Sequence, residues 1–172
     1  LTKSNTTILS MDNENINLNP IDIVEDLIHQ KKWNFSRAAD HELVAEISSQ
    51  WCTYRLYFTW SENINALSLS ITFDIRFPEI KFVQAYELLG LINENLWIGH
   101  FDITSKNGIP AFRHTILSNT DTDSLHKKFE DLVDIGIYEC EKFYPSFQQV
   151  LFEEISPKQA IKFSNFEIIG TA

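Results

Sequence analysis

The sequence is poor in glycine, cysteine and basic residues, and each shortage excludes a class of function. Only five of its 172 residues are glycine, too few for the glycine-rich loops that cradle phosphates or dinucleotides. The two cysteines and five scattered histidines lack the spacing of metal ligands. No apolar run approaches the roughly 18 residues that a membrane-spanning helix needs. We therefore expect no cofactor, no metal ion and no contact with a membrane.

Acidic residues outnumber basic ones by 24 to 14, which gives a formal net charge of −10. On average such a chain repels the phosphate backbone of a nucleic acid, so binding would need a local basic patch. The pairs at 31–32 and 127–128 are the only short runs of lysine, and both are too short to outweigh the remaining charge. Nucleic acid is therefore not expected as a partner, and direct DNA binding is the weakest interpretation.

The ends of the chain and the cysteines bear on domain organisation and cellular setting. Residues 1–18 are rich in Asn, Thr and Ser, without a basic stretch leading into an apolar one, so we expect a disordered tail rather than a signal peptide. We accordingly expect a cytoplasmic protein. There, two reduced and buried thiols at Cys52 and Cys140 are favoured over a disulfide. Residues 19–163 should form a single domain, followed by a tail of undefined structure over 164–172.

Residues 67–77 give the clearest structural signal, because apolar and polar side chains alternate through all eleven positions. A period of two predicts a long antiparallel strand with one face on a core and the other towards water or a partner. Hydrophobic residues make up 44% of the chain and aromatic residues 13%, so large side chains are available for that core.

The same patterns predict an α+β fold with an antiparallel five-stranded sheet in the order α-β-β-β-α-β-β-α. Helices are expected over 20–32, over 78–99 and from 124 onward, where Pro145 should kink or break the last helix. The residues at 156–157 could begin a further short helix. Strands are expected over 42–47, 51–60, 67–77, 100–106 and 109–117.

Asn107-Gly108 is a strong signal for a two-residue turn between the last two strands. Such a turn fixes the register, and it predicts that Ile103 faces Phe112 and that Asp102 faces Arg113. The apolar side chains of the hairpin would then share one face and the polar side chains the other.

His100, Asp102 and Arg113 form the nearest approach to a catalytic group, on the polar face of this hairpin. A histidine beside an aspartate could act as an oriented base, and the arginine could hold an anion. The alternative is an ordinary cross-strand ion pair, which is favoured because no nucleophile is tied to these residues. His114 falls on the apolar face and is expected to be a buried, hydrogen-bonded residue.

Trp51, Arg55 and Tyr57 are the candidate partner-binding residues, on the side of the second strand opposite the core. Exposed aromatic side chains beside an arginine are typical of interface hot spots. The alternative is that a neighbouring helix of the same domain covers them, and the sequence does not decide between the two.

Five segments carry a resemblance to a known family. Residues 51–58 (WCTYRLYF), 73–79 (FDIRFPE), 93–102 (NENLWIGHFD), 112–114 (FRH) and 139–145 (ECEKFYP) resemble the YbjN-domain proteins of bacteria, within a similarity that runs from about 19 to 161. The resemblance implies a fold like that of type III secretion chaperones, pairing as a homodimer and a role in regulating sensory transduction. It implies no catalytic residues.

These observations lead to one main expectation and one alternative. We expect a non-enzymatic protein, paired with itself, that binds another protein as a regulator or in a chaperone-like way. The alternative is a small-molecule-binding module or hydrolase that uses the face with His100, Asp102 and Arg113.

Overall fold

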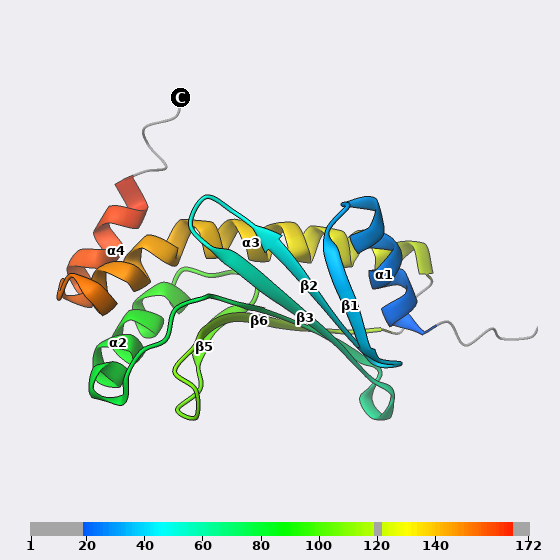
Figure 1. Cartoon of the computed structure of the whole chain (residues 1–172), viewed down its shortest axis with the longest axis horizontal. Helices are drawn as coiled ribbons and strands as arrows, with labels where there is room; N and C mark the ends of the chain where they lie inside the picture. The colour runs from blue at the N-terminus through cyan, green and yellow to red at the C-terminus, as the bar shows by residue number, and fades with distance from the viewer. Residues whose placement is uncertain (1–18, 119–121, 167–172) are drawn as a thin grey trace, which may run out of the picture.

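A six-stranded antiparallel sheet, in the order β1-β2-β3-β4-β6-β5, forms the frame of the protein (Figure 1). The computed structural model describes residues 19–118 and 122–166; the predicted tail over 1–18 lies outside them. The predicted α+β class with one antiparallel sheet is confirmed, but the sheet has six strands, not five. The elements are α1 (Pro20–Gln30), β1 (Asn34–Ala39), β2 (Glu42–Ser48), β3 (Thr53–Ser61), the 3-10 helix η1 (Glu62–Ile64), β4 (Ala66–Thr72), the 3-10 helix η2 (Glu79–Lys81), α2 (Phe82–Asn93), β5 (His100–Ile103), β6 (Pro110–Leu117), α3 (Thr122–Phe152) and α4 (Pro157–Phe166).

Strand β1 is the element that the sequence patterns missed. It pairs with β2 so that Phe35 faces Ala45, and the register shifts between Arg37 and Ala39. Its side chains are only partly buried or exposed, as is common at the edge of a sheet, so apolar and polar residues do not alternate in it. Pairing with β2, rather than local preference, therefore determines this strand.

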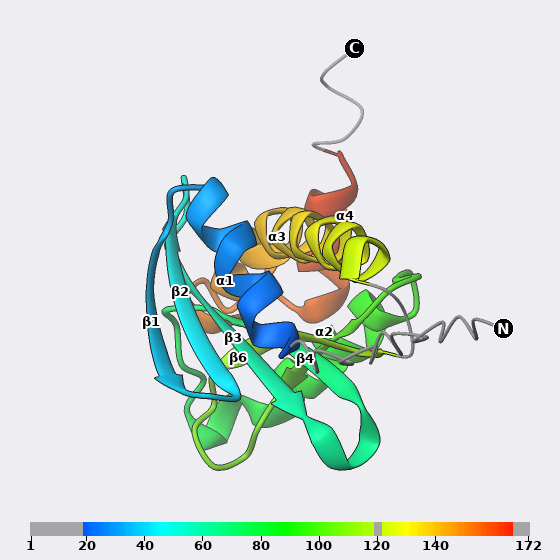
Figure 2. The same cartoon turned by 90° about the vertical axis from the view of Figure 1, so that its right-hand side faces the viewer.

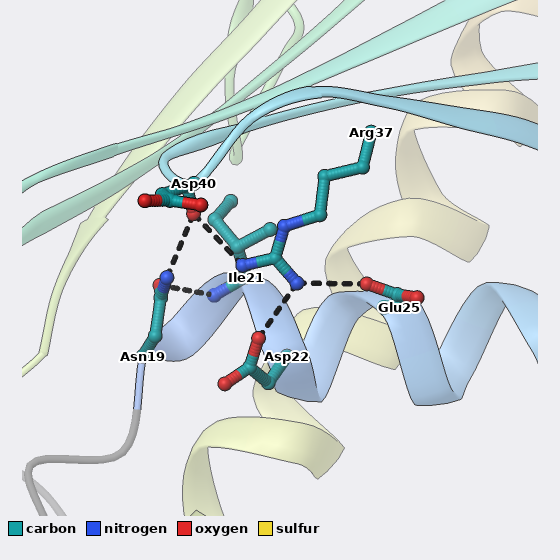
Figure 3. Close-up of polar contacts among 6 residues, drawn as sticks. All are labelled: Asn19, Ile21, Asp22, Glu25, Arg37 and Asp40. Atoms are coloured by element: carbon teal, nitrogen blue, oxygen red, sulfur yellow. Dashed lines mark hydrogen bonds and ion pairs between the residues drawn. The ribbon is translucent and has the colours of Figure 1, made fainter.

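The turn after β1 is tied to the start of α1 by a polar network (Figure 3). Asn19 caps the helix by accepting a hydrogen bond from Ile21 N at 3.0 Å, as its sequence position predicts, and its Nδ2 donates to the carbonyl of Asp40. The Arg37 guanidinium donates to Asp22 and Glu25 at 2.7 and 2.8 Å and also to the Asp40 carbonyl. Helix and edge strand are thus fixed to each other.

Helices α1 and α3 cover one face of the sheet, and none of the helices within residues 19–118 and 122–166 covers the opposite face (Figures 1 and 2). Helix α2 packs against β5 and α3, and α4 packs against α2 and α3. Gly136 lets α3 approach the sheet closely: a Cβ there would lie 2.8 Å from Cδ1 of Ile71 and 2.9 Å from Cε1 of Phe112. The core therefore lies between the helices and a single face of the sheet.

The strand predicted over 67–77 is shorter than expected but keeps its predicted faces. Strand β4 ends at Thr72, while Phe73, Ile75 and Phe77 beyond it are still buried. The backbone of this segment pairs with the chain entering β6: Phe73 N donates to the Pro110 carbonyl at 3.1 Å, and Phe77 N donates to the Gly108 carbonyl at 2.8 Å. Alternating burial therefore continues after the regular ladder has ended.

The predicted hairpin register is wrong by two residues. Ile103 faces Pro110 and Phe101 faces Phe112, so the connection is longer than a two-residue turn. Asn107 folds the loop on itself, because its Oδ1 accepts hydrogen bonds from Ile109 N at 3.0 Å and from the Thr104 hydroxyl at 2.6 Å. A shift of two residues keeps every side chain on its predicted face, which explains why the apolar pattern did not reveal it.

Helix α3 continues through Pro145, so the predicted break is wrong. Proline inside a helix costs about 3 kcal/mol because it removes a hydrogen bond and crowds the preceding turn. The turns that follow carry Phe147 and Val150, both buried, and their packing offsets this cost. Helix α4 extends to Phe166, so residues 164–166 belong to the fold and not to a tail.

Two glycines give opposite expectations for substitution by alanine. Gly108 has a φ of +66°, and a Cβ there would lie 2.2 Å from the Phe77 carbonyl oxygen, so Gly108→Ala should lower the free energy of unfolding by about 1–3 kcal/mol. Gly90 lies inside α2, where a Cβ would meet nothing within 4 Å, so Gly90→Ala should raise it by about 0.5–1 kcal/mol. Urea unfolding measures both, and wild-type stability in Gly108→Ala would contradict this account of the loop.

Candidate binding site on the open face of the sheet

The register of the strands arranges the outer side chains of the sheet in rows. One row crosses β3, β4, β6 and β5 through Tyr57, Ser70, Arg113 and His100. The next row crosses the same strands through Arg55, Thr72, Ala111 and Asp102. Strands β3 and β5 thus carry aromatic or charged side chains in both rows and β4 carries small ones, while β6 carries Arg113 in one row and Ala111 in the other.

This difference in size leaves a hollow of about 700 Å³ on the open face, which we call the trough. Ser70, Thr72 and Ala111 lie in the middle of the rows, where their short side chains leave room. The segment after β4 and the loop before β6 add the remaining lining. The lining residues are Thr53, Arg55, Tyr57, Thr59, Ser70, Thr72, Phe73, Asp74, Ile75, Arg76, Asn107, Ile109, Ala111 and Arg113.

The trough carries positive charge in a strongly acidic chain. Three of the four arginines in the sequence line it, namely Arg55, Arg76 and Arg113. Asp74 is the one carboxylate among the lining residues, so their formal charge is +2, and Glu46 and Asp102 outside the lining form ion pairs with Arg55 and Arg113. The hydrogen bond that Arg55 donates to Glu46 at 2.8 Å raises the pKa of Arg55 and holds it in the charged form.

The structure separates the three residues that the sequence assigned to one partner-binding face. Arg55 and Tyr57 line the trough, on the side of β3 opposite the core, and Tyr57 is 38% exposed. Trp51 precedes β3, in a turn where Ser49 N donates to the Cys52 carbonyl. Its ring stacks on Tyr144 of α3, with centroids 6.3 Å apart, so it does not belong to the trough. The strand assigned from residue 51 was two residues too long at its start, which caused this error.

His100, Asp102 and Arg113 share the outer face, as predicted, but in a different register. His100 faces Arg113 directly, while Asp102 faces Ala111 and reaches Arg113 diagonally. Asp102 Oδ2 lies 3.1 Å from Arg113 Nε in an ion pair whose geometry does not make a hydrogen bond. Only Arg113 of the three lines the trough. His114 lies on the other face, half-buried, and burial lowers its pKa.

Arg76 and the small residues of β4 were not singled out from the sequence, although the signal was present. The alternation over 67–77 already placed Arg76, Thr72 and Ser70 on the outer side. The prediction gave that side to water or a partner but named none of its residues as candidates for binding.

A second polar cluster joins α3 to the segments before β3 and after β4. Cys52 and Cys140 are buried free thiols, as predicted. Burial raises the pKa of Cys52 to about 12 and that of Cys140 well above its ordinary value. The Tyr144 hydroxyl donates to Asp74 at 2.8 Å, and burial raises its pKa as well. The two thiols and the Tyr144 hydroxyl are therefore held in their neutral forms.

Neither a metal site nor a membrane span emerges within residues 19–118 and 122–166. In those ranges, no three His, Cys, Asp or Glu side chains come together as metal ligands would. None of the helices there combines the length and the apolar character needed to cross a bilayer.

One comparison with known proteins gives a match. The family model YbjN, described as "Putative bacterial sensory transduction regulator", matches residues 20–149, which is most of the chain. No curated protein and no solved structure matches.

The raised pKa of Cys52 predicts a loss of stability in alkali. Above pH 9 the unfolded chain ionises this thiol while the folded chain keeps it protonated up to about pH 12, so the free energy of unfolding falls across that window. Below pH 9 the thiol is neutral in both states and contributes no slope. Urea unfolding between pH 8 and 10.5 should show a shallower fall for Cys52→Ala than for the wild type; equal slopes would contradict the assignment.

Proposed function

The chain belongs to the YbjN family, and on that premise we propose that it is a regulator without catalysis of its own, which binds another protein on the open face of its sheet. The trough is the observation that carries this proposal. It is the part of the sheet that α1 and α3 leave uncovered, and Tyr57 and three arginines line it. Tyrosine and arginine are the residue types, with tryptophan, that most often dominate binding energy at protein interfaces.

The state of the cysteines supports a non-catalytic role over the hydrolase alternative. A cysteine nucleophile needs a lowered pKa and access to solvent. Cys52 and Cys140 have the opposite properties, since both are buried and their pKa values are raised. Asp102 forms an ion pair with Arg113, which supports a structural role for Asp102.

We also propose that the protein works in the cytoplasm and in a chaperone-like way. Two buried thiols that remain free are typical of a reducing compartment. One sheet face covered by helices and one left for a partner would suit a protein that holds another chain. The observed order, with β1 and α4 added, differs from the expected α-β-β-β-α-β-β-α, so kinship with type III secretion chaperones rests on the resemblance alone.

We further propose that the chain forms a homodimer through α2 and its flanking residues. Ile80, Val83 and Tyr86 are 85%, 77% and 46% exposed, and their spacing of three places them along one side of η2 and α2. Trp97, in the segment after α2, is fully exposed. A two-fold pairing that covers such apolar residues is the commonest form of soluble oligomer.

Tyr57→Ala should weaken partner binding by at least about tenfold without unfolding the chain, because it removes a large side chain from the trough wall. The partner is first captured with the tagged wild-type protein from a lysate of the encoding organism, identified by mass spectrometry and then purified for titration. Tyr138→Ala on α3 is the matched control, since Tyr138 is an exposed tyrosine outside the trough and its loss should leave affinity unchanged.

Equal affinity of the wild type and Tyr57→Ala would refute the trough as the binding site. Turnover of a substrate that His100→Ala abolishes would instead support the enzyme alternative.

The dimer should dissociate in Val83→Glu, because pairing would then bury two uncompensated charges. Light scattering at tens of micromolar should give a dimer for the wild type and a monomer for this variant. Ile64→Glu in η1 introduces the same charge at another exposed apolar residue and should remain dimeric. A monomeric wild type at that concentration would refute the proposal.

A further inference from the structure

We propose that the segment bound in the trough is acidic: an extended stretch of the partner protein whose carboxylates pair with Arg55, Arg76 and Arg113. This inference rests on the proposed function and adds the chemistry of the partner. Three quarters of the arginines of a chain with net charge −10 are gathered on one face of one sheet. Arginine is suited to this task because its planar guanidinium binds carboxylates in bidentate fashion.

The arginines retain capacity for a ligand. Arg76 is exposed and makes no hydrogen bond or ion pair with any other described residue. Arg55 is paired with Glu46, yet its side chain is still 60% exposed. Arg113 is 43% exposed; its Nε is buried beside Asp102, and its two terminal nitrogens make no hydrogen bond with another described residue. A carboxylate entering the trough would therefore meet donors that the fold has not already used.

The spacing of two arginines suits an extended segment. Arg55 of β3 and Arg113 of β6 lie two strand spacings and one row apart, with β4 between them. The usual spacing between strands and rise per residue then give a separation of roughly 12 Å between their Cα atoms. Residues i and i+4 of an extended chain lie on the same side, about 13 Å apart. Between the two arginines, the hydroxyls of Ser70 and Thr72 can bond the backbone of the segment. Acidic residues four positions apart in the bound segment would thus lie opposite Arg55 and Arg113.

The size of the charge favours an acidic segment over a nucleic acid. A formal charge of +2 is matched by two or three carboxylates. A nucleic acid carries a negative charge about every 3.4 Å along each strand, and most of those charges would face the acidic remainder of the protein. The openness of the face towards solvent also suits a chain that passes across it.

The test uses two fluorescein-labelled peptides, one with five Glu-Thr repeats and one with five Gln-Thr repeats, titrated with the whole chain in 50 mM salt. Anisotropy should show that the Glu peptide binds at least tenfold more tightly than the Gln peptide. Arg76→Glu should weaken binding of the Glu peptide at least tenfold. Lys128→Glu on α3 changes the net charge equally at another exposed position and should stay within twofold of the wild type. Circular dichroism establishes that both variants are folded.

Several outcomes would overturn the inference: equal binding of the two peptides, no binding of either, or no effect of Arg76→Glu. Tighter binding of a ten-residue thymidine oligonucleotide would identify a nucleic-acid site instead. Equal displacement by free glutarate, at the same carboxylate concentration, would identify a site for small anions. With the purified partner, loss of binding in Tyr57→Ala but not in Arg76→Glu would overturn the acidic segment alone, and no loss in either variant would overturn the proposed function too.

Discussion

The packing of aromatic rings around Phe147 holds together three parts of the chain that are distant in sequence. The ring of Phe147 in α3 packs against Phe73 after β4 and Phe101 of β5, with ring centroids 5.2 and 5.7 Å apart. The ring of Phe73 also packs against Tyr144, with centroids 5.3 Å apart. The pairs of Phe73 with Phe147 and Tyr144 are edge-to-face, and the pair of Phe101 with Phe147 is tilted; aromatic pairs contribute about 0.5–1.5 kcal/mol each beyond burial. Because Phe147 lies past Pro145, the cluster depends on the helix continuing through the proline. The same cluster anchors the segment whose outward residues form one wall of the trough.

The alternation of buried and exposed side chains after β4 contributes to both the core and the trough. In the segment after β4, Phe73, Ile75 and Phe77 are buried while Asp74 and Arg76 between them are exposed. Every residue committed to the core therefore directs a neighbour to the open face. The apolar side of the pattern supplies stability, and the polar side lines the trough.

The sequence predicted which side chains face the core far better than how the strands end and pair. Faces follow from a period of two, which residues 67–77 and β3 display clearly. Strand β1 was missed because it is a partly exposed edge whose pairing is set by β2. The hairpin register was missed because a shift of two residues leaves every side chain on the same face. It also depends on a residue far from the hairpin in sequence, since Phe77 N donates a hydrogen bond to the Gly108 carbonyl. Of the site, Arg55 and Tyr57 were found, whereas the placement of Trp51 depended on a strand boundary, the least reliable feature of such patterns.

For an acidic partner, the trough is a small attractive region on a chain whose net charge is repulsive. This difference affects the rate of association. At low ionic strength the field of a chain with charge −10 extends over tens of ångströms and slows the approach of any acidic partner. Added salt shortens that range to about 8–10 Å, which removes the distant repulsion before it weakens the close arginine–carboxylate pairs. Association with an acidic partner would therefore be fastest at intermediate ionic strength. A basic surface on a basic protein would instead show a rate that falls continuously as salt is added.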